Sequence, residues 1–148
     1  MKAILLIPFL FFCVISKGQS KNYSQFINEH SINEKQIVKT KGEKDEITYL
    51  GTVKDNKGKI LFFVLSVYSE IQAAINIHAH ANVIFLDKNK VLRKQFELGF
   101  RDELPFKLKN NSLYFHCLNR KTGNKEQYSN KLSTQIPEFL CVSPNECY

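Results

Sequence analysis

Short alternations of apolar and polar residues dominate the chain from residue 46 onward. Residues 47–54 are rich in β-branched side chains, and the turn at 55–58 separates them from a strongly apolar run at 60–65. Asn56 and Gly58 permit the positive φ that a tight turn requires, so these two segments predict a β-hairpin. Further strands are expected in segments bounded by polar or turn-forming residues, at 91–98, 106–108, 112–118, 126–132 and 136–142.

Residues 69–81 fit two patterns. Ile71, Ala74, Ile75 and His78 recur at helical spacing. From Ile75 to residue 85, however, every second position is apolar, and Asn or His stands between these positions as far as Asn82. Because the alternating pattern is longer, it favours a strand, with a bend near residues 78–82.

The expected connections are of hairpin length. Parallel strands need longer crossovers, so the strands should pair antiparallel. The pattern predicts one mainly β domain at 46–148, an antiparallel meander of about seven strands that forms a small barrel or a two-layer sandwich. Residues 19–45 are polar with scattered apolar positions, and we expect a loosely held segment there with one short helix within 24–37.

The N-terminus has the three parts of a secretory signal peptide. Lys2 supplies a positive start, residues 3–15 are continuously apolar, and Ser16 and Gly18 place small residues before a cleavage point at Gln19. The apolar run is shorter than the ~20 residues that cross a bilayer. Residues 1–18 are therefore expected to be a cleaved signal peptide, which makes the protein secreted or periplasmic and leaves no integral membrane segment after cleavage.

Charge adds little to this picture. Cleavage would remove Lys2 and Lys17 but no acid, so the formal charge of +7 would fall to +5. The excess is mostly lysine interleaved with acidic residues, whereas proteins that read nucleic acids concentrate arginine and cluster their charge. We therefore expect no nucleic-acid partner, and the mild positive charge favours an acidic surface or an anionic envelope component.

Three cysteines would remain after cleavage: Cys117, Cys141 and Cys147. An odd number in an oxidising compartment leaves one cysteine outside an intramolecular disulfide. A Cys141–Cys147 bridge would close a short loop with Pro144-Asn145 at its turn, and a Cys117–Cys141 bridge is the alternative. The spacing of the three does not match a metal site.

His78 and His80 are the most prominent candidate site residues. Two residues apart on a strand, they would share a face, and His116 on another expected strand could complete a three-histidine site for zinc or copper. The spacing alone is a weak signal, because no nearby carboxylate accompanies it. No catalytic motif is present, and no cofactor is otherwise implied.

The sequence thus predicts a non-enzymatic exported binding or interaction module. Its partner would be another protein or an envelope component, recognised through a face or an edge of the sheet. The alternative is a metal-binding protein or metal-dependent enzyme that uses His78, His80 and His116.

Overall fold

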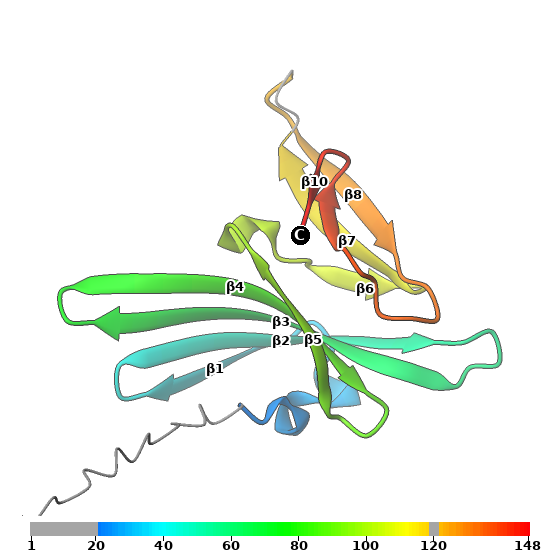
Figure 1. The fold of residues 1–148 in the computed structure, drawn as a ribbon, viewed down its shortest axis with the longest axis horizontal. Helices are drawn as coiled ribbons and strands as arrows, with labels where there is room; N and C mark the ends of the chain where they lie inside the picture. The colour runs from blue at the N-terminus through cyan, green and yellow to red at the C-terminus, as the bar shows by residue number, and fades with distance from the viewer. Residues whose placement is uncertain (1–20, 119–121) are drawn as a thin grey trace, which may run out of the picture.

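The computed structural model describes residues 21–118 and 122–148. This part of the chain is mainly β and antiparallel, which confirms the predicted fold class (Figure 1). The largest sheet contains, in spatial order, β1 (Lys35–Thr40), β2 (Glu43–Lys54), β3 (Ile60–Ala73), β4 (Asn76–Asp87) and β5 (Leu92–Leu98). The expected signal peptide at 1–18 lies outside the described residues.

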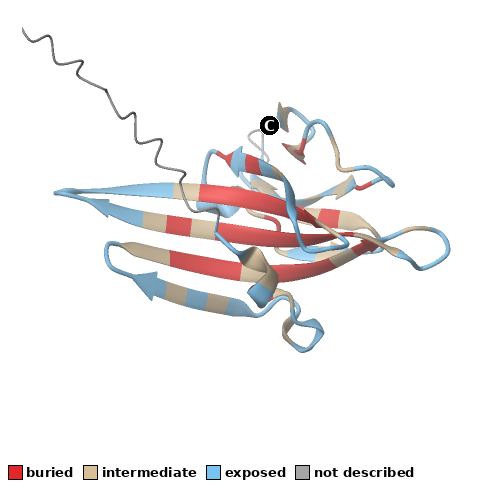
Figure 2. Cartoon of the chain, turned by 60° about the horizontal axis from the view of Figure 1, so that its bottom comes forward, coloured by how far each residue is buried: buried red, intermediate tan, exposed pale blue. Residues whose placement is uncertain are grey.

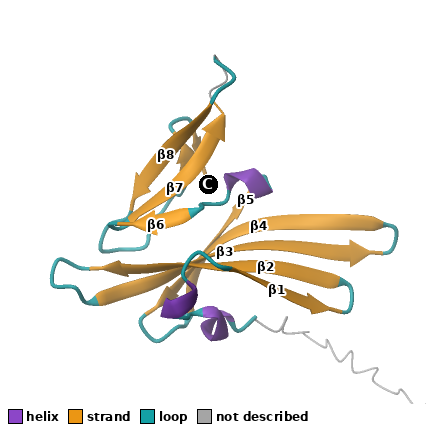
Figure 3. Ribbon diagram, turned by 180° about the vertical axis from the view of Figure 1, so that it is seen from behind, coloured by secondary structure: helices purple, strands orange, loops and turns teal. Residues whose placement is uncertain are grey.

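A second, smaller sheet lies against the first. It contains β6 (Lys107–Lys109), β7 (Ser112–Leu118) and β8 (Lys125–Lys131). A terminal hairpin of β9 (Cys141–Ser143) and β10 (Glu146–Cys147) forms a separate two-stranded sheet. Seen from either side, β7 and β8 cross the direction of β2–β4 (Figures 1 and 3). The large sheet is not closed on itself, so the arrangement is a sandwich-like meander rather than a barrel.

The helical segments are short. They are the 3-10 turns η1 (Tyr23–Phe26), η2 (Glu29–Ser31) and η3 (Arg101–Glu103). None of the helices in the described ranges has the length and apolar character needed to cross a membrane.

The large sheet is buried on both faces. One face packs against the second sheet, where Phe85 contacts Phe62 and Phe96 edge-on at ring-centroid distances of 5.6 and 5.7 Å. The opposite face carries a second core, which Phe26 of η1 helps to cover. Residues 62–67 and 81–86 are consequently buried without interruption, which explains why these strands are almost continuously apolar (Figure 2).

A β-bulge at Gly51 allows β2 to contribute side chains to both cores. The register with β3 shifts between Tyr49 and Gly51, and Gly51 has a φ of 129°. Before the bulge, Tyr49 faces the core beside η1; after it, Val53 faces the second sheet. Without the extra residue these two odd-numbered positions would point to the same face.

Residues 69–73 and 76–81 are extended, as the alternating pattern predicts, but the predicted bend near 78–82 is wrong. The chain reverses earlier, through a two-residue turn at Ala74 and Ile75 that joins β3 to β4. Ala74 has a φ of 52°, a conformation usually taken by Gly or Asn. The usual turn residues are absent, so the pattern gave no sign of a reversal here.

The sheet also begins before the expected domain start at residue 46. β1 and the first residues of β2 lie within the segment expected to be loose, and 24–37 forms two 3-10 turns and part of a strand instead of one helix. At the other end, only residues 141 and 142 of the expected strand 136–142 are extended, as the start of β9. These differences arise because the boundaries depend on pairing with strands that are distant in the sequence. A local pattern of apolar and polar residues contains no information about that pairing.

Candidate functional site

The strand β4 is longer than its neighbour β5. β4 pairs with β3 as far as Ala73 opposite Asn76, whereas its pairing with β5 ends at Ala81 opposite Leu98. Residues 76–80 therefore have a strand partner on one side only. We call this segment the open edge of β4.

Long-range contacts make β5 leave β4 at this point. The backbone N–H of Gly99 donates to the hydroxyl of Tyr148 (3.1 Å), and the N–H of Phe100 donates to the Glu103 carboxylate (3.0 Å). The Tyr148 hydroxyl in turn donates to Glu103 (2.7 Å). Burial raises the pKa of Tyr148 to about 12, and its hydrogen bond to Glu103 acts in the same direction. Tyr148 thus fixes the position at which the chain leaves the sheet after β5.

An ion cluster anchors η3 just beyond this departure. Lys35 and Lys44 each lie 3.0 Å from a carboxylate oxygen of Glu46, and Arg101 of η3 pairs with the same carboxylate. The Arg101 guanidinium also lies 4.7 Å from the ring centroid of Tyr68. Burial alone would raise the pKa of Glu46, but the hydrogen bonds from Lys35 and Lys44 and the charges of Lys35 and Arg101 lower it to about 2.

The open edge carries no charged side chain. Residues 71–86 contain neither Asp, Glu, Lys nor Arg. Ile77 is 65% exposed, and Ile75 in the adjoining turn is 92% exposed. Edge strands in natural proteins are usually protected by charges, and the other outer strands follow that rule with Lys35 and Lys39 on β1, Arg93, Lys94 and Glu97 on β5, Lys107 and Lys109 on β6, and Lys125 and Lys131 on β8.

The two faces of the open edge differ. By strand alternation Ile77 and Ala79 point to the same face as buried Ala81, whereas His78 and His80 point to the opposite face. His80 Nδ1 lies 2.6 Å from the Glu97 carboxylate. The register partners on β3 do not continue this division, since Gln72 and Glu70 lie beside Ile77 and Ala79, and Ile71 lies beside His78.

A short row of polar groups crosses the sheet on the histidine face. Ser69 on β3 is the register partner of His80, and its hydroxyl donates to Asp45 at 2.5 Å. Lys21 also binds Asp45, at 2.8 Å. Because the Ser69 hydroxyl is directed to Asp45, it is not arranged as a nucleophile activated by His80.

The structure does not bring the three candidate histidines together. His116 lies on β7 in the other sheet, where its ring stacks on Phe106 at 4.1 Å between centroids. Within residues 21–118 and 122–148, no three His, Cys, Asp or Glu side chains gather in the manner of a metal site. The expected convergence of His116 with His78 and His80 is therefore not found.

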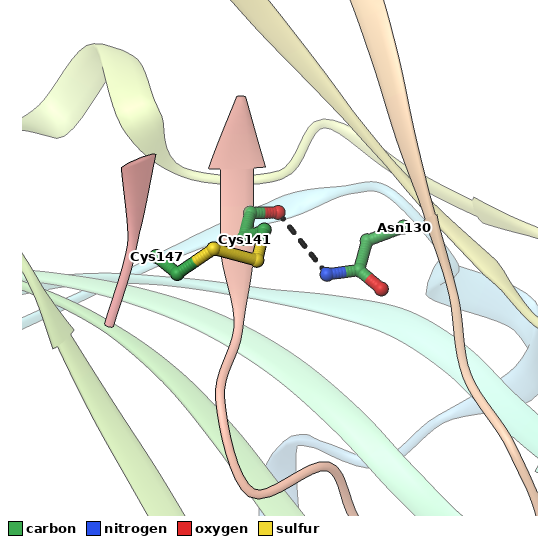
Figure 4. The surroundings of a disulfide bond; sticks show 3 residues. All are labelled: Asn130, Cys141 and Cys147. Carbon is green, nitrogen blue, oxygen red and sulfur yellow. Dashed lines mark hydrogen bonds between the residues drawn. A yellow bond between two sulfur atoms is a disulfide. The ribbon is translucent and has the colours of Figure 1, made fainter. Parts of the chain in front are cut away.

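The predicted Cys141–Cys147 disulfide is confirmed (Figure 4). It closes the β9–β10 hairpin, and Asn130 on β8 donates a hydrogen bond to the carbonyl of Cys141 at 3.2 Å. The alternative Cys117–Cys141 bridge is not formed, and Cys117 has a free thiol.

Cys117 and His116 line a shallow cleft of about 820 Å³ between β7 and the terminal hairpin. Exposed Phe100 and Leu118 contribute to its apolar lining. Its other lining residues include four carboxylates, from Asp102, Glu103, Glu126 and Glu146. Glu103 is already engaged by Tyr148 and by the backbone of Phe100, so this cleft has a structural role in holding the chain after β5.

No protein-family model matches this chain, and no curated protein or solved structure resembles it. The functional argument therefore depends on the geometry alone. The open edge is the feature that sequence reasoning missed; the absence of charge over residues 71–86 was its only signal.

Proposed function

We propose that the protein is a non-enzymatic interaction module that binds an extended segment of another protein as an added strand at the open edge of β4. The observation that carries this proposal is the unequal length of β4 and β5, which leaves residues 76–80 paired on one side. Binding by strand addition uses backbone hydrogen bonds for affinity and alternate side chains for specificity.

The backbone of the open edge supports this proposal. Alternate residues of an antiparallel strand direct their N–H and C=O groups to opposite sides. Part of the backbone of residues 76–80 therefore faces away from β3, where β5 no longer covers it. After Leu98 the chain leaves β4 and enters η3. An incoming strand would therefore occupy the position beside β4 that β5 has vacated.

We also propose that the protein acts after export. The leader at 1–18 has the pattern of a secretory signal peptide, and disulfides such as Cys141–Cys147 persist in oxidising compartments. N-terminal sequencing of the protein recovered outside the cytoplasm should begin at Gln19. A recovered chain that begins at Met1 would contradict cleavage.

The binding proposal can be tested with a phage-displayed library of short random peptides as the probe. An enriched peptide should slow hydrogen exchange at alternate amides within residues 76–80, because those amides would gain hydrogen bonds. Binding with protection confined to another part of the fold, or no enriched peptide at all, would overturn the proposal.

A matched pair of variants separates the edge from the rest of the surface. Ile77→Lys places a charge on the open edge, and an edge lysine opposes strand addition. Val91→Lys makes the same kind of change at an exposed residue beyond the opposite end of β4. We expect Ile77→Lys to lose peptide binding, Val91→Lys to retain it, and both to melt like the parent protein.

A further inference from the structure

We infer that the outward face of the second sheet binds the anionic surface of a lipid bilayer. This face belongs to β6, β7 and β8, whereas the open edge belongs to the large sheet, so the inference does not depend on strand addition. The strand register defines the face, and we call it the lysine face. Its central residues are Tyr114 and His116 of β7, and its lysines are Lys107, Lys109, Lys125 and Lys131.

Burial shows which way the side chains of β7 point. Leu113 and Phe115 are fully buried in the core against the large sheet. Tyr114 and His116 alternate with them and therefore point outward. The terminal hairpin packs on the inward side, where Val142 joins the same core. The lysine face is consequently turned to solvent.

The positive charge of the lysine face is not compensated. Its four lysines are exposed, and none of them forms an ion pair within residues 21–118 and 122–148. On the large sheet, by contrast, Lys35 and Lys44 are both paired with Glu46. The only acidic residue of β6, β7 and β8 is Glu126, and its position opposite Cys117 places it on the inward side.

Aromatic and apolar side chains lie between the lysines. Phe106, just before β6, stacks on His116 at 4.1 Å between centroids and lies 6.4 Å from Tyr114. Leu118, at the end of β7, is 62% exposed. Tyrosine is enriched at membrane interfaces, where long lysine side chains extend their ammonium groups to the headgroups. The composition of this face therefore suits a bilayer surface.

The lysines are spread over the face instead of gathered at one point. Lys125 and Lys131 stand at opposite ends of β8, about 20 Å apart at ~3.3 Å per residue. The strands β6 and β8 lie on either side of β7, which separates their lysines by roughly another 10 Å. A single small anion cannot reach all four ammonium groups. A leaflet of anionic headgroups supplies a partner to each of them at the same time.

Other polyanions fit the lysine face less well. Fixed carboxylates and nucleic acids are recognised mainly by arginine, which binds them in a bidentate manner, and β6, β7 and β8 contain no arginine. Single-stranded nucleic acids also need separate rings on which successive bases stack, whereas Phe106 and His116 cover each other. Lysine is a flexible point charge, which suits headgroups that move independently.

The test measures cosedimentation of the exported protein with vesicles of phosphatidylglycerol and phosphatidylcholine, and with vesicles of phosphatidylcholine alone. A lysine near an anionic leaflet contributes about fivefold in affinity, so Lys125→Gln/Lys131→Gln should bind the anionic vesicles about 25-fold more weakly. Lys39→Gln/Lys41→Gln removes the same charge from exposed lysines of the large sheet and its β1–β2 turn, and it should bind like the parent protein. Binding should also weaken between ~0.1 M and ~1 M salt, because the Debye length falls from ~10 Å to ~3 Å.

A second pair of variants distinguishes a bilayer from a soluble polyanion. The Leu118 side chain would leave water at a bilayer, so Leu118→Ser should weaken vesicle binding about fivefold. Ile37→Ser, at an exposed apolar residue of β1, should not weaken it. All these changes are at exposed positions, and each variant should melt like the parent protein.

Several results would overturn the inference. They are absence of binding to the anionic vesicles, equal binding to phosphatidylcholine alone, or the same loss in both lysine pairs. Vesicle binding unchanged by Leu118→Ser, or weakened equally by Ile37→Ser, would contradict the assignment to lipid. Binding of polyglutamate or of a single-stranded oligonucleotide, lost in Lys125→Gln/Lys131→Gln while vesicles are not bound, would assign the face to an acidic protein or to nucleic acid.

Discussion

Replacing Glu46 by Gln should destabilise the fold in a pH-dependent way. The carboxylate of Glu46 is 10% exposed and pairs with Lys35, Lys44 and Arg101. Its pKa is lowered from 4.5 to about 2. At ~1.4 kcal/mol per pKa unit this shift corresponds to at most ~3.5 kcal/mol. Because the side chains of Lys35 and Arg101 are 51% and 46% exposed, solvent screening reduces the expected contribution to ~1–2 kcal/mol.

The sign follows from the direction of the shift. A carboxyl whose pKa is lowered by folding stabilises the folded state above its unfolded pKa, and this contribution is lost as the pH falls from about 4.5 towards 2. Urea denaturation of the parent and Glu46→Gln proteins should therefore differ by ~1–2 kcal/mol at neutral pH and converge near pH 2. Glu34→Gln, at an exposed position, is the control. A difference that does not change with pH, or one no larger than that of Glu34→Gln, would refute the argument.

Three further changes test other features of the fold. Gly51→Ala should lower stability by about 1 kcal/mol or more in thermal denaturation, because Ala is strained at a φ of 129°; an unchanged melting temperature would contradict the role of the bulge. Tyr148→Phe should speed hydrogen exchange at Gly99, and ultraviolet titration should locate the parent Tyr148 pKa near 12, so that its contribution to stability is lost as the pH rises from 10 towards 12. Reduction of Cys141–Cys147 should cost ~2 kcal/mol in the chain-entropy model, with faster exchange confined to the terminal hairpin; faster exchange in β2–β4 would show that the bridge has a wider role.

Much of the fold could be predicted because its turns are local. The 55–58 turn contains Asn and Gly, and the strands on either side of it pair as expected. The reversal at Ala74 and Ile75 could not be found in this way, since its conformation is held by the pairing of β3 with β4 along their whole length. The early strand β1 was missed for a related reason: it is stabilised by β2, while its own sequence is polar.

The candidate site was less predictable than the fold. The Cys141–Cys147 bridge could be anticipated because the two residues are close in sequence, and the shared face of His78 and His80 follows from strand alternation. The separation of His116 follows from the placement of β4 and β7 in different sheets. The open edge depends on where β5 ends, which is decided by Tyr148 at the far end of the chain.

The cover over the second core has a consequence for the order of folding. Phe26 and its neighbours in η1 are synthesised first, but the face they cover consists of β2, β3 and β4, which follow later along the chain. In a chain that emerges N-terminus first, η1 is therefore present before the sheet face that it covers has formed. The apolar residues of η1 therefore stay exposed until residue 86 has emerged. During this interval they are accessible to a chaperone that binds exposed apolar segments.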